Sequence, residues 1–198
     1  MSVKSNNKQL ILGSTSPFRK EILAKLGLPF DTAAPNIDEA KHDNEKVEDY
    51  VLRLSEQKAQ AVSDQFPHHL IIGSDQAALL DGEVLGKPGN HEKAFMQLTR
   101  ASGKSVVFYT GLCLYDSEQQ TSQKALEIFT VHFRKLSAQQ INNYLEKEQP
   151  LDCAGSFKSE GLGIALFTKL EGDDPNTLIG LPLIRLIQFL ENKELAPI

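Results

Sequence analysis

The sequence has few cysteines, no long apolar run and no metal-ligand motif. Its two cysteines, Cys113 and Cys153, stand far apart and outside any C-x-x-C pair, so neither a disulfide framework nor a zinc site is indicated. No apolar stretch approaches the ~18 residues of a membrane span. The start of the chain, MSVKSNNKQ, lacks the apolar core of a signal peptide. We therefore expect a cytoplasmic protein with buried, inert thiols and no membrane partner.

The chain also lacks an excess of positive charge, which bears on the class of ligand. The formal net charge is -5, whereas a duplex nucleic-acid binder needs a basic face for phosphate contacts. Nucleic acid is therefore not an expected partner, although a few local cations could still hold a small anion. His91-Glu92 begins like the zinc motif H-E-x-x-H, but Phe95 occupies the position of the second histidine. Zinc hydrolase chemistry is thereby disfavoured.

The remaining pattern is that of a globular α/β chain. Its 198 residues are 40% hydrophobic and 24% charged, without internal repeat or linker, and we expect a single domain over 1–198, built as two lobes that share one sheet. A charged turn is expected at 171–176. Extended segments are expected at 10–12, 29–34, 69–75, 77–80, 83–85, 105–115, 125–133 and 163–167, and helices at 17–26, 46–66, 90–101, 137–149 and 182–191.

The stretch 9–21, QLILGSTSPFRKE, predicts a strand, a tight turn and a helix N-terminus. Such a junction presents free backbone N–H groups and the positive end of the helix dipole, where phosphate binds readily. Ser14 and Ser16 add hydroxyl groups, and Arg19 and Lys20 add positive charge. Because Ser16 precedes a proline, it also fits an ordinary helix N-cap, so phosphate binding and plain capping both stay open.

Two later charged positions are unusual for their surroundings. Asp38 and Glu39 end an extended segment as adjacent carboxylates, which are either solvated or turned inward to hold a divalent cation. Lys58 lies on the apolar stripe of the helix expected at 46–66, four residues after Leu54. Its amine either reaches water past a packed stem or meets an anion.

The buried strand expected at 69–75 ends on Asp75. Ligand-binding and catalytic groups of α/β folds tend to follow strand ends, so Asp75 is the best single candidate for chemistry. The hairpin signal Asp81-Gly82 then leads to Lys87 in a Gly-Lys-Pro turn. Residues 82–87 spell G-x-x-x-G-K, one residue short of a P-loop, and are not a Walker motif. Lys87 is either aimed at a phosphate or simply exposed.

Together these residues suit metal-assisted attack of water on a phosphoanhydride, with no covalent nucleophile. Cations would neutralise the polyphosphate, a carboxylate-held Mg²⁺ would polarise a phosphoryl oxygen, and a carboxylate would accept the proton of water. The candidates are Arg19, Lys58 and Lys87 as cations, Glu39 and Asp75 as carboxylates, and Ser14 and Ser16 as hydroxyl donors.

The order and spacing of several motifs resemble the Maf-like nucleoside triphosphate pyrophosphatases over nearly the whole chain. The motifs are S-T-S-P-F-R (14–19), I-D-E (37–39), Q-K-A (57–59), G-S-D-Q (73–76), G-K-P (86–88) and A-G-S-F-K-S-E-G (154–161). The resemblance implies a Maf/ITPase-like α/β fold: a strongly twisted mixed sheet with flanking helices and two lobes around a central cleft. It also implies a possible homodimer.

The implied activity is hydrolysis between the α and β phosphates, which releases a nucleoside monophosphate and diphosphate with Mg²⁺ or Mn²⁺. On the family pattern Asp75 is the proton acceptor, and whether it also binds the metal together with Glu39 stays open. The other positions that match phosphate and metal handling are Ser14, Arg19, Glu39, Lys58 and Lys87.

Three variable positions resemble the branch of the family that acts on 7-methyl-GTP, namely Phe18, Gln76 and Glu160. The branch acting on dTTP and UTP carries S-P-R-R, G-A-D-T and a late glutamine instead. An aromatic face attracts the positively charged methylated base by about 0.5–2 kcal/mol. Glu160 can accept from guanine N1–H and the exocyclic amine together.

Two departures from the branch are Phe18, where tryptophan is more usual, and Gly13, where alanine is more usual. Lys158 and Glu160 could also form a plain surface pair. The alternatives to a house-cleaning 7-methyl-GTP pyrophosphatase are a dTTP/UTP pyrophosphatase of the same fold and a binding regulator of cell division or septum formation.

Overall fold

The computed structural model describes residues 8–198, so most of the polar start on which the expected cytoplasmic location rests lies outside the described residues. The described chain divides into two compact units. The first holds residues 8–76, 110–127 and 180–198, and the second holds 77–109 and 128–179. From residue 8 onward, no helix combines the length and the apolar character needed to cross a membrane.

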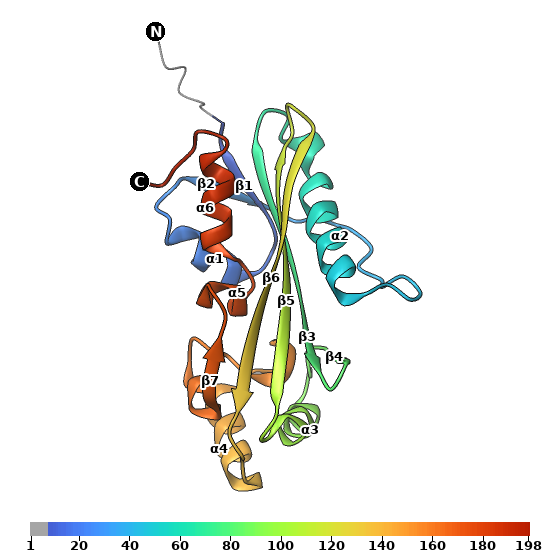
Figure 1. The fold of residues 1–198 in the computed structure, drawn as a ribbon, viewed down its shortest axis with the longest axis vertical. Coiled ribbons are helices and arrows are strands. Elements are labelled where there is room, and N and C mark those ends of the chain that lie inside the picture. The colour runs from blue at the N-terminus through green and yellow to red at the C-terminus, as the bar shows by residue number, and fades with distance from the viewer. Residues whose placement is uncertain (1–7) are drawn as a thin grey trace. The chain divides into compact units, whose positions relative to one another are not determined.

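The strands form one mixed sheet of seven (Figure 1), with the order β2-β1-β3-β5-β6-β7 and with β4 paired to β3. β1 runs parallel to β2 and β3, whereas β4 is antiparallel to β3 and β7 to β6. The expected mixed α/β class is thereby confirmed. The strands are β1 Leu10–Gly13, β2 Phe30–Ala33, β3 Leu70–Leu80, β4 Glu83–Leu85, β5 Ser105–Asp116, β6 Thr121–Phe133 and β7 Phe167–Glu171.

Two of the helices begin at side-chain caps that the sequence indicates. Asn90 accepts from the Lys93 amide at 2.9 Å, and Ser137 forms a capping box with Gln140. The α-helices are α1 Pro17–Ala24, α2 Val47–Gln60, α3 His91–Ala101, α4 Ala138–Glu148, α5 Pro175–Ile179 and α6 Leu183–Glu191; the 3-10 turns are η1 Ser63–Gln65, η2 Ala154–Ser156 and η3 Leu162–Leu166.

In the first unit, α2 lies on one side of the long strands and α1 and α6 lie on the other (Figure 1). β1 and the first part of β3 are therefore buried on both faces, which explains their continuous apolar runs. Ile11, Ile71 and Cys113 pack against α2 with no solvent exposure. Burial raises the pKa of the Cys113 thiol to about 12, so this thiol is inert as expected.

A buried ion cluster fixes the ends of the described chain in the first unit. Asp116, at the end of β5, is fully buried and pairs with Lys8 Nζ at 2.7 Å and Lys193 Nζ at 2.8 Å. Burial alone would raise the pKa of this carboxyl, but the hydrogen bonds from Lys193 and Lys8 lower it to about 2. Asp116 therefore stays charged and links both ends to the β5–β6 hairpin.

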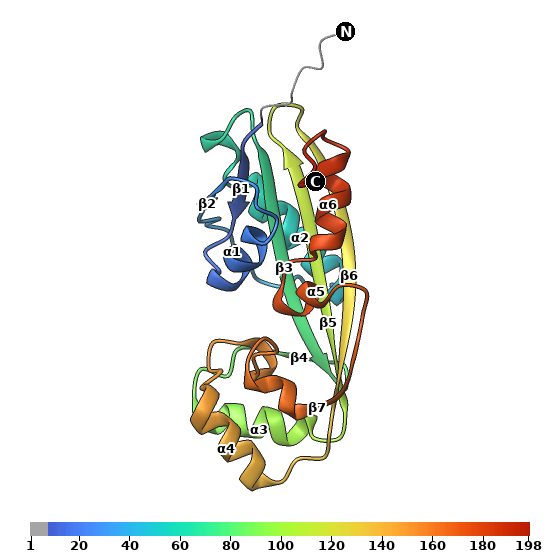
Figure 2. The ribbon, with the colours of Figure 1, turned by 90° about the vertical axis from the view of Figure 1, so that its left-hand side faces the viewer.

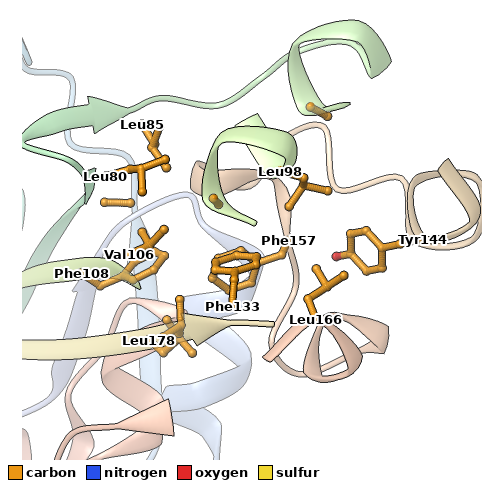
Figure 3. Packing of buried hydrophobic residues seen from close by; sticks show 14 of the residues in the cluster. Leu80, Leu85, Leu98, Val106, Phe108, Phe133, Tyr144, Phe157, Leu166 and Leu178 are labelled. Carbon is orange, nitrogen blue, oxygen red and sulfur yellow. The ribbon is translucent and has the colours of Figure 1, made fainter. Parts of the chain in front are cut away.

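The second unit has its own core, which centres on the ring of Phe157 (Figure 3). This ring makes edge contacts with Phe108, Phe133 and Phe167 at centroid distances of 5.5, 5.7 and 4.9 Å. Phe157 thus anchors the loop in which it lies, as the sequence predicts. The predicted β3–β4 hairpin is also confirmed, with positive φ angles at Asp81 (53°) and Gly82 (84°) that are typical of a type I′ turn.

Several boundaries differ from the sequence prediction; for example, β6 begins at Thr121 rather than 125. The long helix ends at Gln60 rather than 66, because Ser63 Oγ donates to the Gln60 carbonyl and the chain closes into η1. The strand predicted at 163–167 is instead η3, followed by β7 at 167–171. The turn predicted at 171–176 runs into the helix α5, whose Asp-Pro start is a cap signal that the turn prediction overlooked.

Candidate active site

The first unit brings together three of the predicted catalytic residues. The ammonium of Lys58 lies between two carboxylates, 2.5 Å from Asp75 Oδ1 and 2.9 Å from Glu39 Oε1. The side chains of Lys58 and Asp75 are only 8% and 10% exposed, whereas that of Glu39 is 56% exposed. Lys58 therefore meets an anion rather than extending to water, and its place on the apolar stripe of α2 is explained.

Asp75 lies in the middle of a strand, which corrects the prediction that the strand ends at this residue. β3 runs without a break for 11 residues from Leu70 to Leu80 (Figure 2). The apolar residues from Ala77 onward, which form one arm of the β3–β4 hairpin, continue the same strand. The polar pair Asp75-Gln76 therefore interrupts the apolar sequence pattern but not the strand. The carboxylate is thus held by a rigid, buried element rather than by a loop.

Alternation along β3 separates two sets of side chains. Gly73 and Asp75 face α2, where Asp75 meets Lys58. Ser74 and Gln76 face the opposite side of the sheet, where Gln76 Nε2 donates to Thr110 Oγ1 at 2.9 Å. Gln76, predicted to read the base, therefore adjoins the candidate base in sequence but lies on the other face of the strand.

Helix α2 can bring Lys58 to Asp75 because glycines lie beneath it on three strands. A Cβ atom at Gly73 would overlap the Ser55 carbonyl oxygen, and one at Gly111 would overlap that of Val51. At Gly13 it would lie 3.0 Å from the Lys58 carbonyl oxygen. The three contacted helix residues are spaced by four and three positions and so share one face of α2. The glycines thus let the helix backbone rest directly on the sheet.

Arg19 is held through its Nε atom, which donates to the Gly180 carbonyl at 2.8 Å. The same carbonyl accepts from Ser74 Oγ at 2.9 Å, and Ser74 Oγ also lies 2.9 Å from the Gly111 carbonyl. Ser74 is fully buried and precedes Asp75, so one strand positions both the carboxylate and the guanidinium. Within residues 8–198, the Nη groups of Arg19 have no hydrogen-bond partner.

The two predicted serines take part in the turn before α1. Ser14 Oγ accepts from the Ser16 amide at 3.1 Å, and Ser16 Oγ accepts from the Arg19 amide at 3.4 Å. The capping interpretation of Ser16 is confirmed. A hydroxyl that accepts one bond still has its own proton to donate, so the turn geometry leaves both serines able to donate to a phosphate oxygen.

The charges of the cluster influence one another. Burial raises the pKa of the Asp75 carboxyl, and the nearby positive charges of Lys58 and Arg19 oppose that rise. Burial likewise lowers the pKa of Arg19, against the raising effect of the Asp75 and Glu39 charges. A buried carboxyl with a raised pKa is a more basic proton acceptor than an exposed one.

The loop that carries Glu39 is fastened to α2 by two side chains that the sequence analysis missed. Tyr50 donates its hydroxyl to the Glu39 carbonyl at 3.0 Å. Arg53 donates to the Ala40 carbonyl at 3.1 Å and pairs with Glu45 at 2.7 Å. Both residues precede Lys58 on the same helix, so α2 supports the cation and one of its two carboxylates. In the sequence, the one sign of this supporting role was the placement of Tyr50 and Arg53 on the polar face of α2.

The remaining candidates are placed as follows. Phe18 is half-buried in the first turn of α1. Lys87 and Glu160 belong to the second compact unit, and both side chains are exposed. Lys158 pairs with Glu148, with Nζ 3.4 Å from Oε1, so the prediction of a surface pair between Lys158 and Glu160 is wrong.

The donor chemistry of the cluster fits a hard divalent cation. Mg²⁺ prefers oxygen ligands and is often held by one or two carboxylates, with water and substrate phosphates completing the shell. Asp75 and Glu39 supply two carboxylates that converge on one ammonium. Throughout the described chain, no group of three or more His, Cys, Asp or Glu side chains could hold a metal ion by itself. A cation here would therefore depend on the substrate for part of its coordination.

Comparison with known proteins agrees with the resemblance in the motifs. Three curated relatives are named 7-methyl-GTP pyrophosphatase. They come from Colwellia psychrerythraea (60% identical over 93% of this chain and 92% of the relative), Vibrio cholerae (57%, 96% and 97%) and Nitrosococcus oceani (56%, 92% and 92%).

A solved structure, that of the Staphylococcus aureus Ham1 protein, covers 94% of this chain and 100% of its own with a TM-score of 0.52 at 13% identity, and therefore supports the fold alone. Residues 9–193 match the family model described as Maf-like protein. With a match over almost the whole chain and relatives of this identity, the chain belongs to the Maf-like family.

Proposed function

We propose that this chain is a nucleoside triphosphate pyrophosphatase that hydrolyses 7-methyl-GTP to 7-methyl-GMP and diphosphate. The observation that carries the proposal is the buried Lys58 ammonium between Asp75 and Glu39. Relatives named for this activity are 56–60% identical to the chain over more than nine-tenths of its length. The family and the site chemistry thus support the same reaction.

In the proposed reaction, Asp75 accepts a proton from the water that attacks the phosphoanhydride between the α and β phosphates. Its raised pKa suits this role, and β3 holds it rigidly. Lys58 orients Asp75 and contributes positive charge near the polyphosphate. The Gly180 carbonyl, which also accepts from Ser74, holds Arg19 through its Nε atom. The two Nη groups of Arg19 can therefore make bidentate contacts with a phosphate. The bond to the diphosphate breaks, and no covalent intermediate with the protein is required.

Mg²⁺ or Mn²⁺ bound by Glu39 and Asp75 would supply a Lewis acid for a phosphoryl oxygen. Ser14 and Ser16 would donate to phosphate oxygens from the turn before α1. The family motif G-K-P likewise assigns Lys87 to phosphate handling. The support for these roles is the type of each residue and its position in the family motifs.

Base selection is assigned to Phe18, Gln76 and Glu160. N7 methylation gives guanine a positive charge, which favours an aromatic face and a nearby carboxylate. Glu160 is exposed, and its carboxylate can accept from two guanine donors at once. Once the bound nucleotide shields the carboxylate from water, a base without these donors would leave it unpaired, which discriminates more strongly than a lost methyl contact.

The proposed setting is the cytoplasm, where free nucleotides are the substrate pool, and the homodimer implied by the resemblance is part of the same proposal. Light scattering coupled to size-exclusion chromatography would test the assembly. A monomer at micromolar concentration would remove the homodimer and leave the reaction unaffected.

A nucleotide panel tests the activity and the substrate. Diphosphate release would be measured with Mg²⁺ for 7-methyl-GTP, GTP, dTTP, UTP and CTP. We expect the highest kcat/KM for 7-methyl-GTP. A preference for dTTP or UTP would support the pyrimidine alternative, and no release from any nucleotide would favour a binding regulator.

A further inference from the structure

The loop that carries Glu160 closes on itself within the second unit. The amides of Gly161 and Gly163 both donate to the Lys158 carbonyl, at 3.3 and 3.0 Å. A Cβ atom at Gly163 would overlap that carbonyl oxygen, so only glycine permits the closure. Residues 158–163, hereafter the Glu160 loop, thus form a tight turn with Glu160 near its tip.

One side chain from the end of α4 holds this loop on both sides of Glu160. Glu148 Oε2 accepts from the Leu162 amide at 2.8 Å, and Glu148 Oε1 lies 3.4 Å from Lys158 Nζ. Lys158 Nζ also donates to the Glu148 main-chain carbonyl at 3.0 Å. A Cβ atom at Gly161 would lie 2.9 Å from Glu148 Oε2, so the carboxylate rests against the loop backbone.

The base of the loop is fixed as well. The Lys158 amide donates to the hydroxyl of Tyr144 at 3.1 Å, and Tyr144 is buried beside the core that surrounds Phe157 (Figure 3). Ser156 is fully buried and donates to Gln97 Oε1 at 2.5 Å. The backbone before Glu160 is therefore held by α3 and α4 together.

The Glu160 carboxylate is left available. It is exposed, and the hydroxyl of the neighbouring Ser159 donates to it at 3.3 Å. The loop thus combines a fixed backbone with an unburied carboxylate. A binding group on a pre-ordered backbone loses less conformational freedom when its ligand arrives.

We propose that Glu148 is a positioning residue for base selection, which acts by holding the backbone on both sides of Glu160. The inference rests on the proposed function, because it takes Glu160 as the group that reads the base. Glu148 itself makes no contact with the base. Its contribution is to pre-order the Glu160 carboxylate for the paired donors of a guanine edge.

The test compares kcat/KM for 7-methyl-GTP with that for UTP in Glu148→Ala, Glu148→Gln and Lys158→Met. Glu83→Ala is the matched control, because Glu83 forms an exposed ion pair with Arg100 at 2.6 Å in the same unit. We expect Glu148→Ala to lower the substrate ratio about three- to tenfold, mainly through KM for 7-methyl-GTP. Glu148→Gln keeps an acceptor for the Leu162 amide and should retain most of the ratio.

Lys158→Met keeps the Glu148 carboxylate but removes the ammonium, so we expect an intermediate loss that remains measurable if Glu148→Ala does not fold. An unchanged ratio in Glu148→Ala and Lys158→Met, or an equal loss on both substrates, would overturn the inference. Glu160→Ala separates the two proposals. If it lowers the ratio while the Glu148 variants do not, only the positioning role fails; if the wild type shows no preference, both fail.

Discussion

Replacing Gly73 with alanine tests how closely α2 must approach the sheet. The added Cβ would overlap the Ser55 carbonyl oxygen and lie 2.9 Å from the Ala59 amide nitrogen. Ordinary carbon contacts begin near ~3.5 Å, so α2 would have to move outward by more than about 1 Å. Backbone atoms of a helix cannot turn aside as a side chain can. The displacement would therefore carry Lys58 away from Asp75.

The expected cost follows from overpacking of a buried site, which typically destabilises a protein by about 1–3 kcal/mol. For a chain of this size, each kcal/mol lowers the unfolding midpoint by about 2–4 °C. Misplacement of a catalytic group by about 1 Å can also reduce turnover by on the order of 100-fold. We therefore expect Gly73→Ala to lower both the thermal midpoint and kcat for diphosphate release.

Gly13→Ala is the matched control on the neighbouring strand. Its Cβ would lie 3.0 Å from the Lys58 carbonyl oxygen, a tight contact that a small shift relieves. Loss of backbone freedom in the unfolded chain offsets part of the cost by about 0.4–1 kcal/mol. We expect near wild-type stability and activity. A Gly73→Ala protein that matched Gly13→Ala in both measurements would refute the account of the glycine contacts.

Three further predictions follow from other contacts. Asp116→Asn should lower the free energy of unfolding in urea by about 2 kcal/mol near neutral pH, because the folded pKa of Asp116 is lowered to about 2. The contribution of Asp116 is present above its unfolded pKa and is lost as the pH falls from about 4 to 2. A difference in stability between wild type and variant that stayed constant across this window would contradict the assignment. Ser74→Ala should raise KM more than it lowers kcat, because the Gly180 carbonyl that holds Arg19 loses its second donor, and an unchanged KM would contradict this. Phe18→Trp should lower KM for 7-methyl-GTP by about two- to fivefold and leave KM for GTP unchanged, since tryptophan binds cations more strongly; equal changes would argue against stacking on the methylated base.

The sequence predicted the identity of the clustered residues better than their setting. Lys58 was recognisable because a lysine on an apolar stripe needs a partner, and the partner is the carboxylate of Asp75. Asp75 itself was selected for a wrong reason, since it lies inside β3 rather than at its end. A local pattern shows a polar residue in an apolar run, but tertiary pairing decides whether the strand continues.

Hydrogen bonds to backbone groups far away in the chain could not be predicted from the sequence. Gly180 serves through its carbonyl, and Ser74 through a hydroxyl shared between two carbonyls. Neither role leaves a periodic signal, because the partners come from strands and turns far apart in the chain. The same holds for Glu148, whose contact with the Leu162 amide joins α4 to a loop. Helix caps and the type I′ hairpin were predictable because their determinants lie within a few residues.

The most direct test of the central claim is product analysis of 7-methyl-GTP hydrolysis by the wild type and by Asp75→Asn. With Mg²⁺ present, the account predicts equal amounts of 7-methyl-GMP and diphosphate from the wild type. It predicts a rate lower by about 10²–10⁴-fold in Asp75→Asn, with the fold retained by circular dichroism. Formation of 7-methyl-GDP and inorganic phosphate, or wild-type turnover by Asp75→Asn, would contradict it.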